Sequence, residues 1–163
     1  MFRDCIGLES ITIPDGVEYI QGSAFRGCTN LTNVTLPNTI TNIDDYVFNG
    51  CTSLTTITIP NGVTSIGEGA FYRCSGLENV IIPDSVKTIG LGAFANCSSL
   101  ESITIPYNVE TIGRIAFSDC TAMTSLNFPN RTLEQIKEIP DENEILQYPW
   151  SLDESIIKPG ITS

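Results

Sequence analysis

The feature that most constrains the fold is a cysteine that recurs every 23 residues, at Cys5, Cys28, Cys51, Cys74, Cys97 and Cys120. Each cysteine opens the same stretch, which in the first copy begins Cys-Ile-Gly-Leu-Glu-Ser-Ile-Thr-Ile-Pro and closes at Phe25. Self-similarity at a fixed period of about 20–50 residues is typical of a repeat array. We expect five full repeats and a partial sixth, at residues 5–27, 28–50, 51–73, 74–96, 97–119 and 120–129.

The spacing inside each repeat predicts its local structure. In Ser10-Ile11-Thr12-Ile13 polar and apolar residues alternate, which is typical of a strand with one buried face. Pro14 ends this strand because proline cannot donate to a ladder. A second short extended segment is expected at Val63-Thr64-Ser65-Ile66 and its equivalents, followed by a helical turn at residues 67–71.

One repeat of 23 residues cannot bury its own apolar face, so neighbouring repeats must stack and pair their strands. The predicted fold is therefore a repeat solenoid with right-handed coils. Its parallel β-sheet is expected on the concave side, with short second strands and helical turns elsewhere.

The pattern ends after Pro129, and we interpret residues 130–163 as a C-terminal cap and tail. Thr132 and Gln135 have the spacing of a helix capping box. Trp150 is expected to cover the open end of the last coil, and residues 158–163 are expected to form a loose end.

Composition excludes several partners. The chain has 163 residues, with 19 acidic and 8 basic side chains and a net charge of −11. Nucleic acid is disfavoured because its phosphates require lysine and arginine. Membrane insertion is not expected, because no apolar run approaches the roughly 20 residues of a spanning helix.

Catalysis and cofactor binding are not expected either. The sequence has no histidine, no nucleophile elbow and no glycine-rich phosphate loop, so we predict that the protein is not an enzyme. No Cys-x-x-Cys occurs, which argues against a metal site. The cysteines are best interpreted as a ladder of buried free thiols, with disulfides between adjacent rungs as the alternative.

The strongest candidate for function is the polar, outward side of the predicted sheet. Its two columns of side chains define a candidate binding face of ten residues: Ser10, Thr12, Asn33, Thr35, Thr56, Thr58, Asn79, Ile81, Ser102 and Thr104. Extended surfaces of this kind arise directly from stacking and are common binding sites in solenoids. The alternative is that short hydroxyl residues simply suit exposed strands.

The pattern Cys-x-x-Leu-x-x-Ile-x-Ile-Pro, followed by Val-x-x-Ile-x-x-x-Ala-Phe, resembles the BspA-like class of leucine-rich repeats. The resemblance covers about residues 2–129. It implies a cell-surface or secreted bacterial protein whose solenoid binds a protein or glycan ligand in adhesion or host interaction. The alternative function is a structural spacer, with binding located elsewhere in a longer parent protein.

The start of the chain already matches the end of a repeat, because residues 2–5 align with residues 25–28. We therefore expect a fragment of a longer array, and we see no signal peptide in it. The first coil would then present an uncapped strand edge and an apolar layer. Such an end favours end-to-end self-association.

Overall fold

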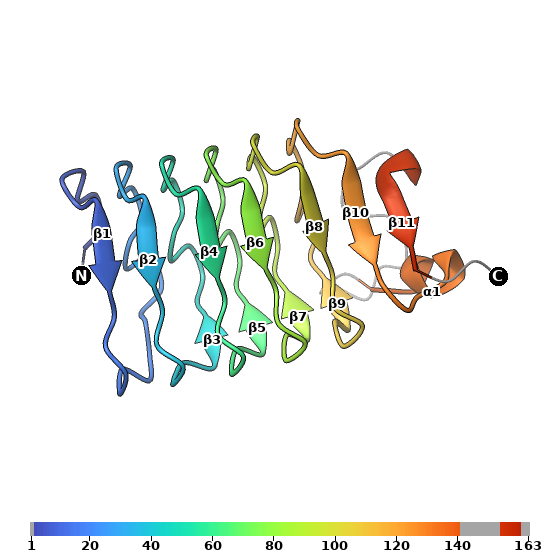
Figure 1. Cartoon of the computed structure of the whole chain (residues 1–163), viewed down its shortest axis with the longest axis horizontal. Coiled ribbons are helices and arrows are strands. Elements are labelled where there is room, and N and C mark those ends of the chain that lie inside the picture. Colours follow the sequence, from blue (N-terminus) through green and yellow to red (C-terminus); the bar gives the residue numbers. More distant parts are fainter. Residues whose placement is uncertain (1, 141–153, 161–163) are drawn as a thin grey trace.

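The computed structural model describes residues 2–140 and 154–160 as a stack of similar coils along one axis (Figure 1). Each coil contributes one strand to the first face of the solenoid. These strands are β1 (Ser10–Thr12), β2 (Asn33–Thr35), β4 (Thr56–Thr58), β6 (Asn79–Ile81), β8 (Ser102–Thr104) and β10 (Ser125–Phe128). All of their ladders are parallel, which confirms the predicted parallel-strand solenoid.

A second parallel sheet runs along another side of the stack. It has four strands in the order β3 (Asn42–Ile43), β5 (Ser65–Ile66), β7 (Thr88–Ile89) and β9 (Thr111–Ile112). Each isoleucine pairs with the isoleucine of the next coil, 23 residues later. The predicted short second strands are therefore present in four consecutive coils.

The core consists of columns of equivalent side chains. Successive phenylalanine rings stack nearly parallel, with centroids 5.2–5.7 Å apart, in the column Phe2, Phe25, Phe48, Phe71, Phe94 and Phe117. The leucines at the fourth place of the inner repeats, such as Leu54 and Leu77, are fully buried. The residues that identify the repeat are thus the residues that form its core.

The corner before each cysteine consists of single hydrogen-bonded turns. In the third coil the amide of Ala70 donates to the carbonyl of Gly67 over 3.4 Å, and Cys74 donates to Phe71 over 3.1 Å. The amide of Phe71 instead donates to Ala93 of the next coil over 2.8 Å. Because alternate amides bond between coils, the expected helical turns stay one turn long.

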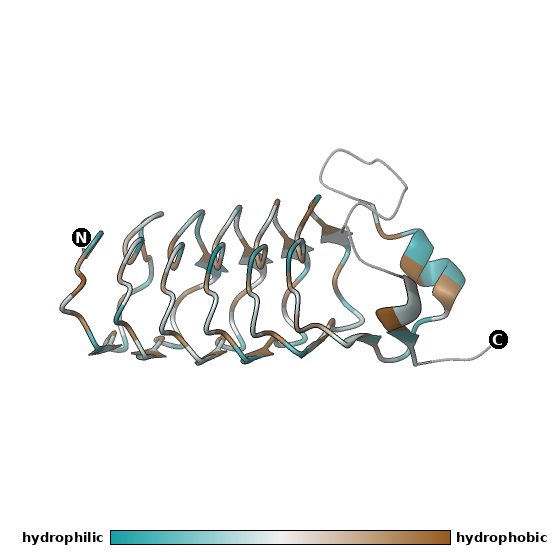
Figure 2. Ribbon diagram, turned by 90° about the horizontal axis from the view of Figure 1, so that it is seen from above, coloured by the Kyte–Doolittle hydropathy of each residue, from teal (hydrophilic) through white to brown (hydrophobic). Residues whose placement is uncertain are grey.

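The C-terminal segment begins with α1 (Leu133–Lys137), where the capping box between Thr132 and Gln135 is present as predicted. Ile136 and Ile139 are buried against the last coil. The 3-10 helix η1 (Glu154–Ile156) then leads into strand β11 (Ile157–Pro159), which pairs in parallel with β10. Figure 2 shows this segment at one end of the stack.

The expectation of a loose end was wrong for Lys158 and Pro159, which lie in β11. Backbone pairing with Asn127 and Phe128 orders this short strand, and its sequence pattern alone is too short to predict it. The prediction for Trp150 falls outside the described residues.

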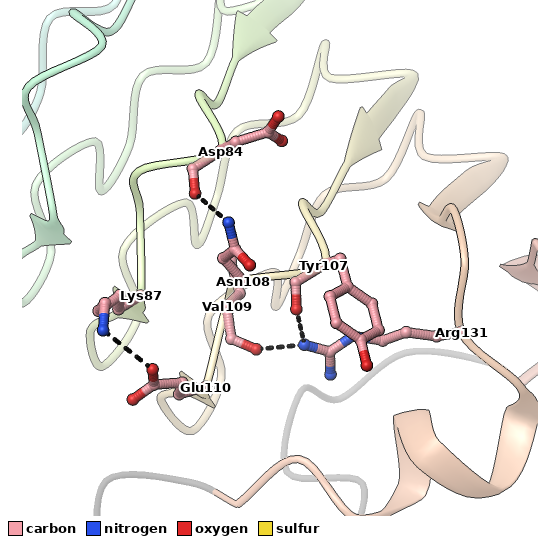
Figure 3. Close-up of polar contacts among 7 residues, drawn as sticks. All are labelled: Asp84, Lys87, Tyr107, Asn108, Val109, Glu110 and Arg131. Atoms are coloured by element: carbon pink, nitrogen blue, oxygen red, sulfur yellow. Dashed lines mark hydrogen bonds and ion pairs between the residues drawn. The ribbon is translucent and has the colours of Figure 1, made fainter.

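Arg131 ties the C-terminal segment to the fifth coil (Figure 3). Its guanidinium donates to the backbone carbonyls of Tyr107 and Val109 and lies 5.2 Å from the centre of the Tyr107 ring. Burial lowers the pKa of Arg131, while its charge is compensated by these carbonyl dipoles. Nearby, Lys87 and Glu110 form an exposed ion pair at 3.3 Å.

Candidate functional site

The structure places all ten residues of the candidate binding face on the outer side of the first sheet. In β2, β4, β6 and β8 the middle residue is buried and the two flanking residues are exposed. In β1 the flanking residues are exposed and Ile11 is half-buried. The alternation in the sequence therefore predicted the direction of each of these side chains.

Strand register aligns the face residues in pairs within each ladder. Ser10 lies opposite Asn33, and Thr12 lies opposite Thr35. Thr58 in turn lies opposite Ile81. Paired strands are spaced about 4.8 Å apart, so each ladder presents neighbouring hydroxyl, amide and methyl groups.

The sheet beneath these columns is interrupted. The strands form ladders in the groups β1-β2, β4-β6 and β8-β10-β11, whereas β2 and β4, and likewise β6 and β8, lie side by side without a ladder. A depression of about 290 Å³ lies at the first of these junctions, between β2 and β4, and is lined by Asn33, Thr35, Thr56 and Thr58 among others. Four of the ten face residues thus surround one hollow, a grouping that the repeat pattern does not predict.

Ile81 is the one large apolar side chain on the face, and 63% of its surface is exposed. It lies beside Thr58, on the far side of β4 from the depression. A single exposed isoleucine needs no explanation by itself. It stands in an otherwise polar column, one strand away from the depression.

The face carries no ionisable side chain, but its edge is acidic. Glu9, Glu78 and Glu101 are exposed at the residue immediately before β1, β6 and β8. Recognition on the face itself must therefore come from hydroxyl and amide hydrogen bonds and apolar contacts. The glutamates and the net charge of −11 disfavour an anionic ligand.

The face ends at β10. Ser125 and Asn127 continue the two columns but are half-buried, and the Asn127 amide donates to the carbonyl of Ile103 over 3.4 Å. Strand β11 then pairs with the outer edge of β10. The C-terminal segment therefore limits the candidate face to the first five strands.

The cysteines form a column in which Cys5 is half-buried and the other five are buried. All six are free, and each of the last five donates its thiol to a phenylalanine carbonyl 26 residues earlier, as Cys51 does to Phe25 over 3.2 Å. Burial raises the pKa of Cys51 and of Cys120 to about 12. The thiolate is the reactive form, so these side chains are structural at neutral pH.

Residues 2–140 and 154–160 contain no apolar helix of the length that a membrane span requires. They also contain no group of three or more cysteine, aspartate or glutamate side chains placed to hold a metal ion.

The repeat model for the BspA type leucine rich repeat region matches residues 1–124 and 66–142 with 6 copies. The chain therefore belongs to the BspA type leucine-rich repeat family, a family of bacterial surface proteins. No curated protein matches the chain.

Solved structures of bacterial leucine-rich repeat proteins share the fold. A leucine-rich repeat protein of T. pallidum is 34% identical, with a TM-score of 0.71 over 74% of this chain and 58% of its own. A leucine-rich cell surface protein of Faecalibacterium prausnitzii is 38% identical, with a TM-score of 0.69 over 78% of this chain and 34% of its own. One from Bacteroides ovatus is 27% identical, with a TM-score of 0.73 over 93% of this chain and 37% of its own. The chain thus covers between about a third and three fifths of the length of these relatives.

Proposed function

We propose that this chain is a non-catalytic binding module of a cell-surface or secreted bacterial protein, and that its ligand is a protein or a glycan in adhesion or host interaction. The observation that carries the proposal is the candidate binding face, with ten exposed side chains on five successive strands and a depression between β2 and β4. Proteins of this repeat class are generally binding modules, and the Faecalibacterium prausnitzii relative is a cell surface protein.

The ligand chemistry follows from the side chains on the face. Neighbouring hydroxyl and amide groups donate and accept hydrogen bonds, which suits either sugar hydroxyls or the backbone of an extended peptide. Ile81 supplies an apolar contact beside the depression. The acidic edge favours a neutral or basic ligand over an anionic one.

Binding is tested on an array that carries host extracellular-matrix proteins and neutral and acidic glycans. We expect the chain to bind at least one matrix protein or neutral glycan, and to bind the acidic glycans least. A chain that is folded by circular dichroism and binds nothing on the array contradicts the proposal and supports the spacer alternative.

We further propose that two copies of the chain associate through their first coils. In the part of the chain that the structure describes, strand β1 pairs only with β2. Ile11 and Ile13 are half-buried, whereas Ile57 and Ile59, their equivalents in the third coil, are 2% and 1% exposed. Ile11 and Ile13 line an apolar depression of about 500 Å³ together with Phe2 and Val17. A second copy of the chain would cover this depression.

Sedimentation velocity over a roughly hundredfold concentration range tests this association. The wild-type chain is expected to shift from monomer to dimer as its concentration rises. An Ile11→Lys, Ile13→Lys variant is expected to stay monomeric, because two charges in the apolar layer must be desolvated on contact. A wild-type chain that is monomeric throughout contradicts the association.

A further inference from the structure

A hollow of about 430 Å³ lies on a different side of the solenoid, on the turns that precede the cysteines. We call it the turn-face hollow. It is lined by Tyr46, Tyr72, Glu68, Asn49 and Arg26, with Gly69, Gly92, Leu91 and Ile115 completing its surface. None of these residues belongs to the candidate binding face.

Gly69 and Gly92, at the same place of two neighbouring coils, create the hollow. The nineteenth place of the repeat holds Ser23, Tyr46, Gly69, Gly92 and Ile115, and its backbone φ is positive, between 50° and 62°, in every coil. Serine, tyrosine and isoleucine tolerate this conformation here, so the backbone alone does not demand glycine. The two glycines instead remove the side chains between Tyr46 and Ile115.

Gly69 has a specific steric role. A Cβ atom at this position would lie 2.5 Å from Cε1 and 2.6 Å from Cδ1 of Tyr46, so the tyrosine ring lies directly against the glycine backbone. The hydroxyl of Tyr46 donates to the carboxylate of Glu68, which fixes the ring across the hollow. Gly92 is different, because a Cβ there would meet its nearest atom, in Ile115, at an ordinary 3.7 Å.

A column of polar and aromatic residues lies beside the nineteenth-place residues and completes the lining of the turn-face hollow. Arg26, Asn49 and Tyr72 occupy the twenty-second place of three consecutive coils. Within residues 2–140 and 154–160, the Arg26 guanidinium, the Asn49 amide and the Tyr72 hydroxyl form no side-chain hydrogen bond. The Tyr72 ring does have a neighbour, because the Arg73 guanidinium lies 5.2 Å from its centre. The backbone beneath them is already satisfied between coils, since Gly69 donates to Leu91 and Gly50 donates to Tyr72, both over 2.8 Å.

We propose that the turn-face hollow binds a neutral saccharide of one or two pyranose rings. Its volume lies within the range of small-molecule sites, which combine apolar and aromatic walls with a few polar groups. An aromatic ring presents an apolar face to the C–H groups of a pyranose. The amide, guanidinium and carboxylate supply planar donors and acceptors for adjacent sugar hydroxyls.

Charge selects a neutral ligand. Among the residues that line the hollow, Arg26 and Glu68 contribute one charge of each sign. Arg73 adds a positive charge beside it, with its guanidinium over the outer side of the Tyr72 wall at 5.2 Å from the ring centre, so the hollow holds no cluster of like charges that would select an ion. The rest of the chain, at −11, repels acidic sugars. The inference is independent of the candidate binding face, which lies on the strands of the first sheet.

Saturation-transfer NMR with the methyl glycosides of glucose, galactose, mannose and N-acetylglucosamine, and with cellobiose, tests the site. The wild-type chain is expected to give a signal with at least one of them and none with glucuronic acid. Gly92→Asn places a side chain in the hollow at a backbone conformation that asparagine tolerates. It is expected to weaken binding at least tenfold, as is Tyr72→Ala, which removes an aromatic wall.

Ser23→Asn makes the same kind of change at the equivalent place of the first coil, outside the hollow, and is expected to bind like the wild type. A Thr35→Lys, Thr58→Lys, Ile81→Lys variant of the candidate binding face is also expected to keep the signal. The inference is overturned if no neutral glycoside binds the wild-type chain, or if binding survives Gly92→Asn. It is also overturned if the candidate-face variant loses the signal while Gly92→Asn retains it.

Discussion

A Phe71→Ala variant is expected to unfold with a free energy about 3–5 kcal/mol lower than that of the wild type. The Phe71 side chain is fully buried, and its ring stacks on Phe48 at 5.5 Å and on Phe94 at 5.2 Å. Truncation leaves a cavity in the middle of the column and removes both ring contacts, each worth roughly 0.5–1.5 kcal/mol beyond its area. Urea unfolding followed by circular dichroism measures the loss.

Phe2→Ala is the matched control, because it makes the same change at the end of the same column. Phe2 is 43% exposed and stacks only on Phe25. Its truncation is expected to cost about 1 kcal/mol, since little area is lost and solvent fills the space. Equal losses for the two variants would show that the column does not stabilise the coils through stacking.

Stability is expected to collapse between about pH 9 and pH 12. Burial raises the pKa of Cys51 and Cys120 from 9.0 to about 12, and raises that of Cys74 and Cys97 well above 9.0. In this window the unfolded chain releases thiol protons that the native chain retains, so alkaline pH favours unfolding. Each such thiol lowers the free energy of unfolding by about 1.4 kcal/mol per pH unit.

Four thiols acting together lower the free energy of unfolding by roughly 5 kcal/mol per pH unit, which exceeds the stability of an ordinary domain within about three units. Below pH 9 the contribution is fully present and independent of pH. Urea midpoints measured from pH 7 to pH 11 test this, with Cys51→Ala as the comparison. Below pH 9 the Cys51→Ala variant is less stable than the wild type by an amount that does not change with pH. Above pH 9 its free energy of unfolding is expected to fall less steeply with pH, by about 1.4 kcal/mol per pH unit. Equal slopes for the variant and the wild type would contradict a raised pKa for the Cys51 thiol.

Much of the fold follows from the 23-residue period. Ser10-Ile11-Thr12-Ile13 and its equivalents form strands because alternation places one apolar side inward, and stacking then forces the copies into register. The same periodicity predicts the phenylalanine column, since equivalent residues of identical coils must superpose along the axis. The strands and the core columns, which the spacing of apolar residues sets, were therefore visible in the sequence.

Features that break the repeat were not visible. Strand β11 owes its order to pairing with β10, a contact between residues about 30 positions apart with no shared pattern. The missing ladders between β2 and β4 and between β6 and β8 result from how the coils pack, and no residue in those strands predicts them.

The candidate binding face illustrates both cases. Its ten residues were predicted to point outward, because strands with one buried face leave the other side exposed. The turn-face hollow was missed, since its signal lies in the residues that differ between coils. Comparing the nineteenth place across the repeats would have shown two glycines between Tyr46 and Ile115. In a solenoid the shared residues define the fold, and the variable ones distinguish one surface from another.

The central claim is that binding takes place on the candidate binding face, and a single affinity comparison tests it. The protein or glycan that binds most strongly on the array is titrated against the wild type and a Thr35→Lys, Thr58→Lys, Ile81→Lys variant. A Thr41→Lys, Asn61→Lys, Thr64→Lys variant makes the same change of charge at exposed residues beside the second sheet. We expect the first variant to bind at least about tenfold more weakly and the second to stay within about twofold of the wild type. Unchanged affinity in the first variant would contradict the claim.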